Sequence, residues 1–278
     1  MWGSLAILYG LLSAISWGAG DFSGGLAAKR TNVYSVVVHA EWIGALGLVA
    51  AALAFGEPIP SGTAMAWGAI AGIAGGIGLT ALYAGLARGR MGIIAPFSAV
   101  LAAALPVLLV ALTEGTPSLV TLLGFVLALA AVWLLARPDT AGFRLHDFGL
   151  PVVAGLGFGL FFIGVHRAGN EAVFWPLVAA RLTALVVILV IALVQRQPLV
   201  PPRSTVALIA LAGLLDAGGN LFFAQAARTG RLDVAAVLAS LYSATTVLLA
   251  WLFLGERVDR AQAVGLLAAF AAIVLISV

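Results

Sequence analysis

Ten long apolar segments separated by short breaks account for most of this 278-residue chain. A helix needs about 20 apolar residues to cross a bilayer, and each segment comes close to that length or exceeds it. Hydrocarbon offers the backbone no hydrogen-bond partner, and the segments are continuous rather than alternating, so they predict helices rather than a β-barrel. We therefore expect an all-α membrane protein with ten transmembrane helices. The segments lie near residues 3–26, 33–55, 63–87, 92–112, 119–136, 148–168, 173–195, 205–228, 234–254 and 261–277.

The charge content of the chain excludes several classes of protein. Only 9% of the residues are charged and 63% are hydrophobic, whereas a soluble domain carries about 25% charged residues. The breaks leave no room for a nucleotide-binding domain, a receptor ectodomain or a nucleic-acid-binding domain, so we expect no nucleic-acid partner. With 0 Cys and 3 His, the chain has no thiol chemistry and offers little for a metal centre. We expect no metal, no other cofactor and no catalytic residues.

The distribution of positive charge predicts the orientation. Lys and Arg are retained on the cytoplasmic side of a membrane, and most of them here fall in the odd-numbered breaks, as in Lys29 and Arg30, or Arg88 and Arg90. We therefore place the odd-numbered connections in the cytoplasm and both termini on the periplasmic side. No basic side chain precedes the first apolar run, so we interpret that run as a retained helix rather than a cleaved signal peptide.

The two halves of the sequence resemble each other. Each half contains five segments, an odd number, so the second half must be inverted relative to the first, as is common in secondary transporters. We expect a first five-helix repeat at 1–136, a cytoplasmic connector at 137–147 and a second repeat at 148–278. A shift of about 141 residues places Trp17-Gly18 on Phe158-Gly159, Gly89-Arg90 on Gly230-Arg231, and Gly124 on Gly265.

Residues 240–257 read SLYSATTVLLAWLFLGER, which resembles the ninth-helix signature of the drug/metabolite transporter superfamily in its ten-helix EamA branch. Residues 181–185, RLTAL, resemble the Arg-led second helix of a repeat in that branch, and Trp17-Gly18 resembles its first-helix pair. The first half departs from the pattern, because Glu114-Gly115 replaces Gly-Glu and Glu41 stands near an expected Arg. Ser243 occupies a place where many relatives carry Pro.

The resemblance implies a function. Members of the superfamily move amino acids, nucleotide sugars, triose phosphates and cationic drugs, and this chain is most similar in size to bacterial aromatic amino-acid exporters. The resemblance implies a secondary transporter of the bacterial inner membrane and not an enzyme. We expect a monomer, because the internal duplication makes a dimer unnecessary for building the cavity. The transporter would export a small metabolite, an aromatic or hydrophobic amino acid, by alternating access. Its partners would be that small molecule and the lipid bilayer, and its cavity would be lined chiefly by spans 1, 3, 4, 6, 8 and 9.

Four charged side chains stand out away from the ends of the predicted spans, where each costs about 2.5–3.5 kcal/mol without a partner or a water-filled cavity. Glu41 lies near the counterpart of Arg181 in the repeat, so an ion pair across the two-fold axis is plausible. That pair either holds the halves together or faces the cavity and binds the charged ends of a zwitterion. Asp21 is either a coupling group or a solvated helix end. The predicted coupling or gating residues are Asp21, Glu41, Arg181 and Asp216.

Polar and aromatic residues in the same spans suit a small amphipathic solute. Asp216 and Asn220 lie one helical turn apart on one face, and Phe223 continues it. The same stripe is also compatible with hydrogen bonding between helices, and the aromatic residues with an ordinary core. Glycines such as Gly72 and Gly213 predict close helix packing. The residues predicted to bind substrate are Trp17, Glu41, Tyr83, Phe158, Arg181, Asn220, Phe223, Tyr242 and Ser243.

Two alternatives to a transporter belong to other classes. Residues 18–21, GAGD, match the Gly-x-Gly-Asp pattern of intramembrane aspartyl proteases, with Asp216 as the second acid, but Asp216 follows Leu215 where that family carries Tyr. A small-solute channel is the other alternative, although no filter sequence is visible. ATP-driven transport is excluded for this chain, because its one Lys is followed by Arg and cannot belong to a phosphate-binding loop.

Overall fold

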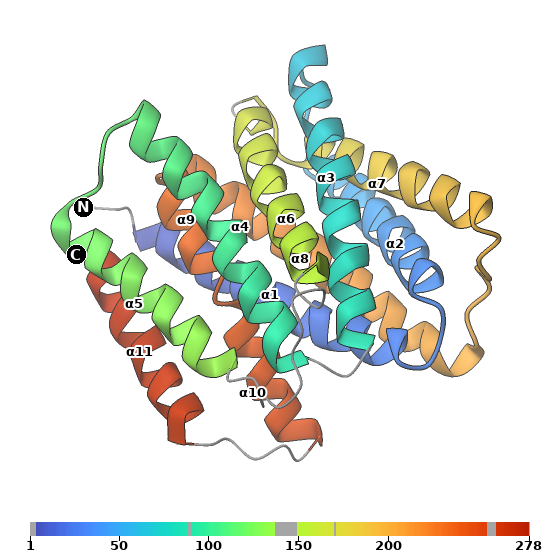
Figure 1. The fold of residues 1–278 in the computed structure, drawn as a ribbon. Coiled ribbons are helices and arrows are strands. Elements are labelled where there is room, and N and C mark those ends of the chain that lie inside the picture. Colours follow the sequence, from blue (N-terminus) through green and yellow to red (C-terminus); the bar gives the residue numbers. More distant parts are fainter. Residues whose placement is uncertain (1–3, 88–90, 137–148, 170, 255–259, 278) are drawn as a thin grey trace.

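The computed structural model describes residues 4–87, 91–136, 149–169, 171–254 and 260–277, and within these ranges every regular element is a helix (Figure 1). The predicted boundaries agree with the helices to within about two residues. The helices are α1 Ser4–Ala28, α2 Val33–Ala54, α3 Gly62–Ala87, α4 Met91–Thr113, α5 Leu119–Ala136, α6 Gly149–Ala168, α7 Phe174–Val194, α8 Arg203–Thr229, α9 Leu232–Ala239, α10 Tyr242–Leu254 and α11 Arg260–Ser277.

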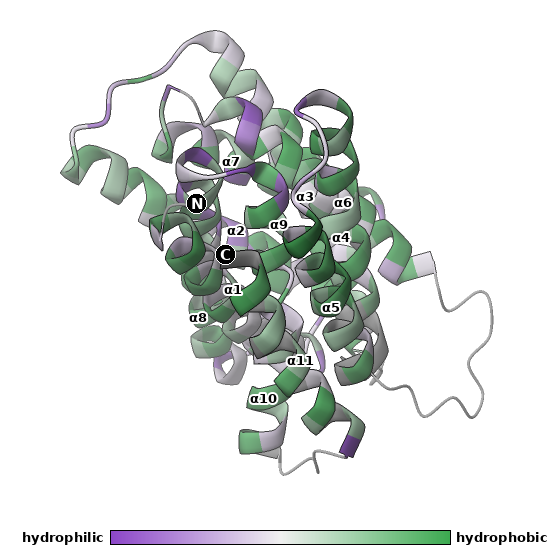
Figure 2. Cartoon of the chain, turned by 90° about the vertical axis from the view of Figure 1, so that its left-hand side faces the viewer, coloured by the Kyte–Doolittle hydropathy of each residue, from purple (hydrophilic) through white to green (hydrophobic). Residues whose placement is uncertain are grey.

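Seven segments of the described chain are long and apolar enough to cross a membrane, namely α1, α2, α3, α6, α7, α8 and the stretch Leu232–Phe253 that spans α9 and α10. Two shorter apolar helical stretches, Phe97–Thr113 and Leu119–Ala131, lie in α4 and α5. Large hydrophobic side chains remain exposed along these helices, and Figure 2 shows hydrophobic colour running over their outer surfaces. Apolar surface of this extent requires lipid around it, so the chain is a multi-pass membrane protein.

The ninth predicted span is broken rather than continuous, although it contains no proline. At Ser240 and Leu241 the chain leaves the α-helical pattern, and the Leu241 N–H donates to the carbonyl of Leu238, 3.2 Å away. Two hydroxyl groups satisfy carbonyls at the break: Ser240 donates to Val237 at 2.7 Å and Ser243 donates to Ser240 at 3.4 Å. These bonds give backbone carbonyls a partner at the point where the helix is interrupted inside the bilayer.

Helix contacts between the two halves occur in equivalent pairs. Helix α1 packs on α8, and its counterpart α6 packs on α3. Helix α3 packs on α7, and the equivalent contact is that of α8 on α2. Helix α4 packs on α6, and the equivalent contact is that of α9 and α10 on α1. The remaining large contacts join counterparts directly, α2 with α7 and α5 with α11 (Figure 1). A two-fold relation between the halves produces this exchange of partners, so the architecture fits a two-repeat transporter.

Two glycine contacts repeat the relation at the level of atoms. A Cβ added at Gly72 of α3 would overlap the backbone of Ala180 in α7. A Cβ added at Gly213 of α8 would lie 2.5 Å from the carbonyl oxygen of Ala40 in α2. The close packing predicted at these glycines is therefore confirmed, and it brings the residues after Ala40 and Ala180, which are Glu41 and Arg181, toward the middle of the bundle.

The connection after α2 caps the start of α7. Glu57 accepts hydrogen bonds from the backbone N–H groups of Val173, Phe174 and Trp175 at 2.8, 2.8 and 3.1 Å. Val173 makes no side-chain capping bond of its own, so Glu57 supplies the acceptor that a helix N-terminus needs. In return, Glu171 accepts bonds from the N–H and hydroxyl of Ser61, which lower the pKa of Glu171.

We expect Glu57→Ala to destabilise the protein by about 1–2 kcal/mol, because three backbone donors at the start of α7 lose their acceptor. Thermal unfolding of the purified protein in detergent measures the change. Glu114→Ala is the matched control, since Glu114 is exposed at the end of α4 and its replacement should leave the midpoint unchanged. Equal effects of the two substitutions would contradict the capping role.

Candidate functional site

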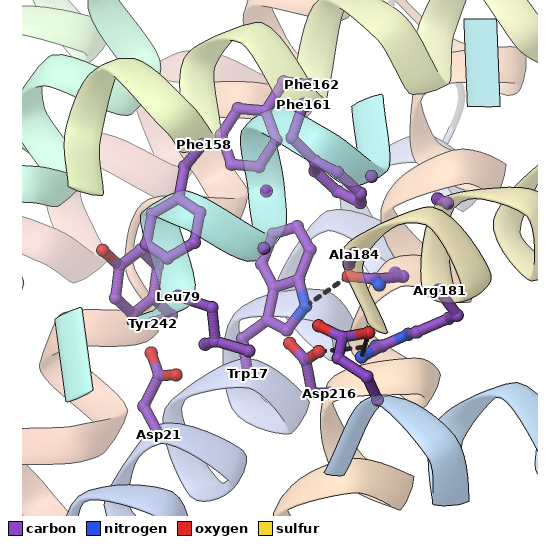
Figure 3. Close-up of a pocket in the computed structure, with 16 residues that line it drawn as sticks. Trp17, Asp21, Leu79, Phe158, Phe161, Phe162, Arg181, Ala184, Asp216 and Tyr242 are labelled. Carbon is purple, nitrogen blue, oxygen red and sulfur yellow. Dashed lines mark hydrogen bonds and ion pairs between the residues drawn. The ribbon is translucent and has the colours of Figure 1, made fainter. Parts of the chain in front are cut away.

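A cavity lies between the two halves, and the space in it that protein atoms do not fill is about 540 Å³ when the open space at its mouth is included. Its walls come from α1, α2, α3, α6, α7, α8 and α10 (Figure 3). The expected spans 1, 3, 6, 8 and 9 contribute, but the described part of the fourth does not, and spans 2 and 7 take its place. The lining residues are Trp17, Asp21, Glu41, Gly72, Gly75, Gly76, Leu79, Phe158, Phe161, Phe162, Ala180, Arg181, Ala184, Asp216, Asn220 and Tyr242.

One guanidinium group joins two carboxylates at the wall of this cavity. Arg181 donates from Nη1 to Glu41 Oε2 at 2.9 Å, and its Nη2 lies 2.5 Å from Asp216 Oδ2. The Arg181 side chain is 2% exposed and that of Asp216 is 14% exposed. The predicted ion pair between Glu41 and Arg181 is present. The sequence did not indicate that Asp216 would be a second partner of the same arginine.

Asp21 differs from the other three charged residues. It is 5% exposed and lines the cavity, yet within the described residues its carboxylate has no hydrogen bond or ion pair. It lies on the side of Tyr242 and Leu79, while Asp216 lies beside Arg181 (Figure 3). The burial of Asp21 does not agree with a solvated helix end.

Trp17 is fixed by contacts between α1 and α8. Its Nε1 donates to Asn220 Oδ1 at 2.8 Å, and its indole lies against Gly219, where a Cβ would overlap the ring. Ser13 and Ser16 on the same face of α1 donate to α8 carbonyls at 2.9 and 2.6 Å. These bonds hold the two helices together, and the indole is thereby held at the cavity wall.

Aromatic rings from α6 form the opposite part of the wall. Phe162 stacks on Trp17 with ring centroids 5.4 Å apart, and Phe161 meets Trp17 edge to face at 6.4 Å. Phe158 meets Tyr242 edge to face at 6.4 Å. Of the three phenylalanines, the sequence predictions named only Phe158. The spacing of 158, 161 and 162 places all three on one helical face, which is a signal that could have found the others.

Tyr242 reaches the cavity because the ninth span is broken just before it. It is the first residue of α10, and its hydroxyl lies 3.0 Å from Ser98 Oγ and donates to the carbonyl of Ala95 at 3.3 Å. Both partners belong to α4, so this helix supports the site although none of its described residues lines it.

Three of the residues predicted to bind substrate do not line the cavity. Phe223 is fully buried behind the wall and stacks on Phe162 at 4.5 Å. Ser243 is buried, and its hydroxyl is used at the helix break. Tyr83 lies against Gly24 of α1, where a Cβ would overlap the phenol. Its hydroxyl has no hydrogen-bond partner within the described residues. The other six lie at the wall, and they are Trp17, Glu41, Phe158, Arg181, Asn220 and Tyr242.

The arrangement does not favour an aspartyl protease. Such an enzyme needs two carboxyl groups that share a proton, which requires them to be close neighbours. Here Asp216 is engaged by Arg181, and Figure 3 shows Asp21 apart from it. The cavity presents both aromatic rings, such as Trp17 and Phe158, and charged groups, such as Asp21 and Arg181, to a solute.

Comparison with known proteins gives one family. A profile of the EamA-like transporter family matches residues 4–137 and 149–278, which correspond to the two halves of the chain. A solved structure described only as "Crystal structure of protein" has 19% sequence identity and a TM-score of 0.73, and the match covers 97% of this chain and 95% of that chain. A likeness at this identity shows the fold alone. No curated protein matches the sequence.

Proposed function

This chain belongs to the EamA-like transporter family, and from that premise we propose that it is a secondary transporter. It carries a small organic solute with an aromatic or hydrophobic group across the bacterial inner membrane. Ten spans form two inverted five-helix repeats, at 1–136 and 148–278. A site between the repeats opens alternately to the two sides of the membrane. Both termini lie on the periplasmic side, the connector 137–147 lies in the cytoplasm, and the transporter works as a monomer.

One observation carries this proposal: the cavity between the repeats combines rings and buried charge. Ligand sites are concave, largely apolar and supplied with a few convergent polar groups, and here Trp17 and Phe158 line the same cavity as Asp21 and Arg181. Transporter sites lie near the midplane at the repeat interface. Aromatic amino acids, which the resemblance implied, carry a ring of the kind that could pack against Trp17 and Phe158.

The proposal is tested with purified protein in liposomes preloaded with labelled phenylalanine or with its amino alcohol, phenylalaninol. We expect at least one of them to be released faster than from protein-free liposomes. Phe158→Ala should slow that release at least tenfold, because it removes a ring from the cavity wall. The matched control is Phe253→Ala, since Phe253 is 72% exposed on α10 and should release at the wild-type rate. Folded protein that releases neither compound would overturn the proposal.

A further inference from the structure

The negatively charged side chains around the cavity outnumber the positively charged ones. Asp21, Glu41 and Asp216 are three carboxylates, and Arg181 is the one cation among the described residues that line the cavity. Ionised together, the four groups leave an excess of negative charge in a buried site. Buried charge without a partner is costly. An occupant that brings a positive charge therefore completes this site, whereas an occupant that brings a carboxylate worsens the imbalance.

Arg181 has little capacity left for a carboxylate from a solute. Its two terminal nitrogens already face Glu41 and Asp216, and among the described residues Nε has neither a hydrogen bond nor an ion pair. Arginine binds a carboxylate most strongly through two parallel N–H···O hydrogen bonds. The carboxylate of a solute could form such a pair with Arg181 only if Glu41 or Asp216 moved away from it. The binding of a zwitterion would therefore break an existing buried ion pair.

Asp21 is the carboxylate that remains for a positive group. Besides Asp21, the titratable groups that line the cavity are the acids Glu41 and Asp216, both tied to Arg181, and the phenol of Tyr242. On α9, Asp233 is paired with Arg231. Among the described residues that line the cavity, no cation is thus left over for Asp21. The rings of Trp17, Phe158 and Tyr242 line the same cavity, and aromatic faces attract cations.

We propose that the solute is an aromatic organic cation, with its positive group at Asp21 and its ring against Trp17 and Phe158, and that a zwitterionic amino acid is a poorer occupant. The inference rests on the proposed function, since it names the substrate class of the same cavity. It predicts that the protein binds molecules of similar size with different affinities, according to their charge.

Three compounds with the same phenyl ring test this by calorimetric titration of the purified protein. Phenylalaninol is a cation in which a hydroxymethyl group replaces the carboxylate, phenylalanine is a zwitterion, and 3-phenylpropionate is an anion. We expect phenylalaninol to bind at least tenfold more tightly than phenylalanine, and 3-phenylpropionate to bind least. Equal or tighter binding of phenylalanine would overturn the proposal, and so would the absence of any phenylalaninol binding.

Asp21→Asn tests the position of the positive group. The variant keeps the size of the side chain and should weaken phenylalaninol binding at least tenfold, and it should reduce the preference for phenylalaninol over phenylalanine. Glu171→Gln removes one negative charge from an exposed connection and should leave both affinities unchanged. Thermal unfolding shows that each variant is folded. If folded Asp21→Asn bound phenylalaninol as the wild type does, the assignment of Asp21 would be wrong.

Failure of transport and failure of this inference are distinguishable. Binding selective for phenylalaninol without release from proteoliposomes would contradict the transporter function while leaving the charge selectivity of the cavity in place. Release of phenylalanine in preference to phenylalaninol would support transport and overturn the inference.

Discussion

Replacing Arg181 with methionine should destabilise the protein by about 3–5 kcal/mol, because the substitution leaves two buried carboxylates without their cation. Methionine is unbranched and flexible enough to fill the space, so the lost charge dominates the effect. The thermal unfolding midpoint in detergent should fall by roughly 6–20 °C, given about 2–4 °C per kcal/mol for a chain of this size.

A combined variant separates charge from packing. Adding Glu41→Gln and Asp216→Asn to Arg181→Met removes the uncompensated carboxylates and should restore most of the lost stability, because a neutral buried cluster can replace an ion network at little cost. Arg203→Met is the matched control, since Arg203 is exposed at the first residue of α8. If Arg181→Met unfolded at the wild-type temperature, the ion network would have no structural role.

Gly72→Ala should have the second largest effect, about 3 kcal/mol of destabilisation. The added methyl group would meet the backbone of Ala180, which cannot rotate away as a side chain can, so α3 and α7 would have to separate. Because Gly72 also lines the cavity, solute release should fall together with stability.

Gly47→Ala provides the matched control for this substitution. Gly47 lies in α2, and a Cβ there would meet only Leu214 Cδ2 at 3.5 Å, an ordinary contact. We expect this variant to unfold within about 0.5 kcal/mol of the wild type. Unfolding midpoints that agree between Gly72→Ala and Gly47→Ala would show that the seam between α3 and α7 is looser than the structure indicates.

Much of the fold could be read from the sequence because lipid imposes a simple rule. An apolar run of spanning length becomes a helix, since the backbone has no other way to satisfy its hydrogen bonds in hydrocarbon. The pairing of Glu41 with Arg181 followed from the repeat, which places their positions on opposite sides of one axis. The break at Ser240 did not follow, because the sequence there has no proline and its hydroxyl side chains are equally compatible with a continuous helix.

The sequence by itself determined the helices, the duplication and the charged residues that need partners. Only the tertiary structure decided which faces of those helices meet. A helix surrounded by lipid and protein is apolar on all sides, so its sequence does not mark an inner face as an amphipathic helix does in water. For that reason Tyr83 and Phe223 could not be distinguished from Trp17 and Phe162. Helix rotation, fixed by contacts such as Gly72 on Ala180, puts the first two behind the wall and the others on it.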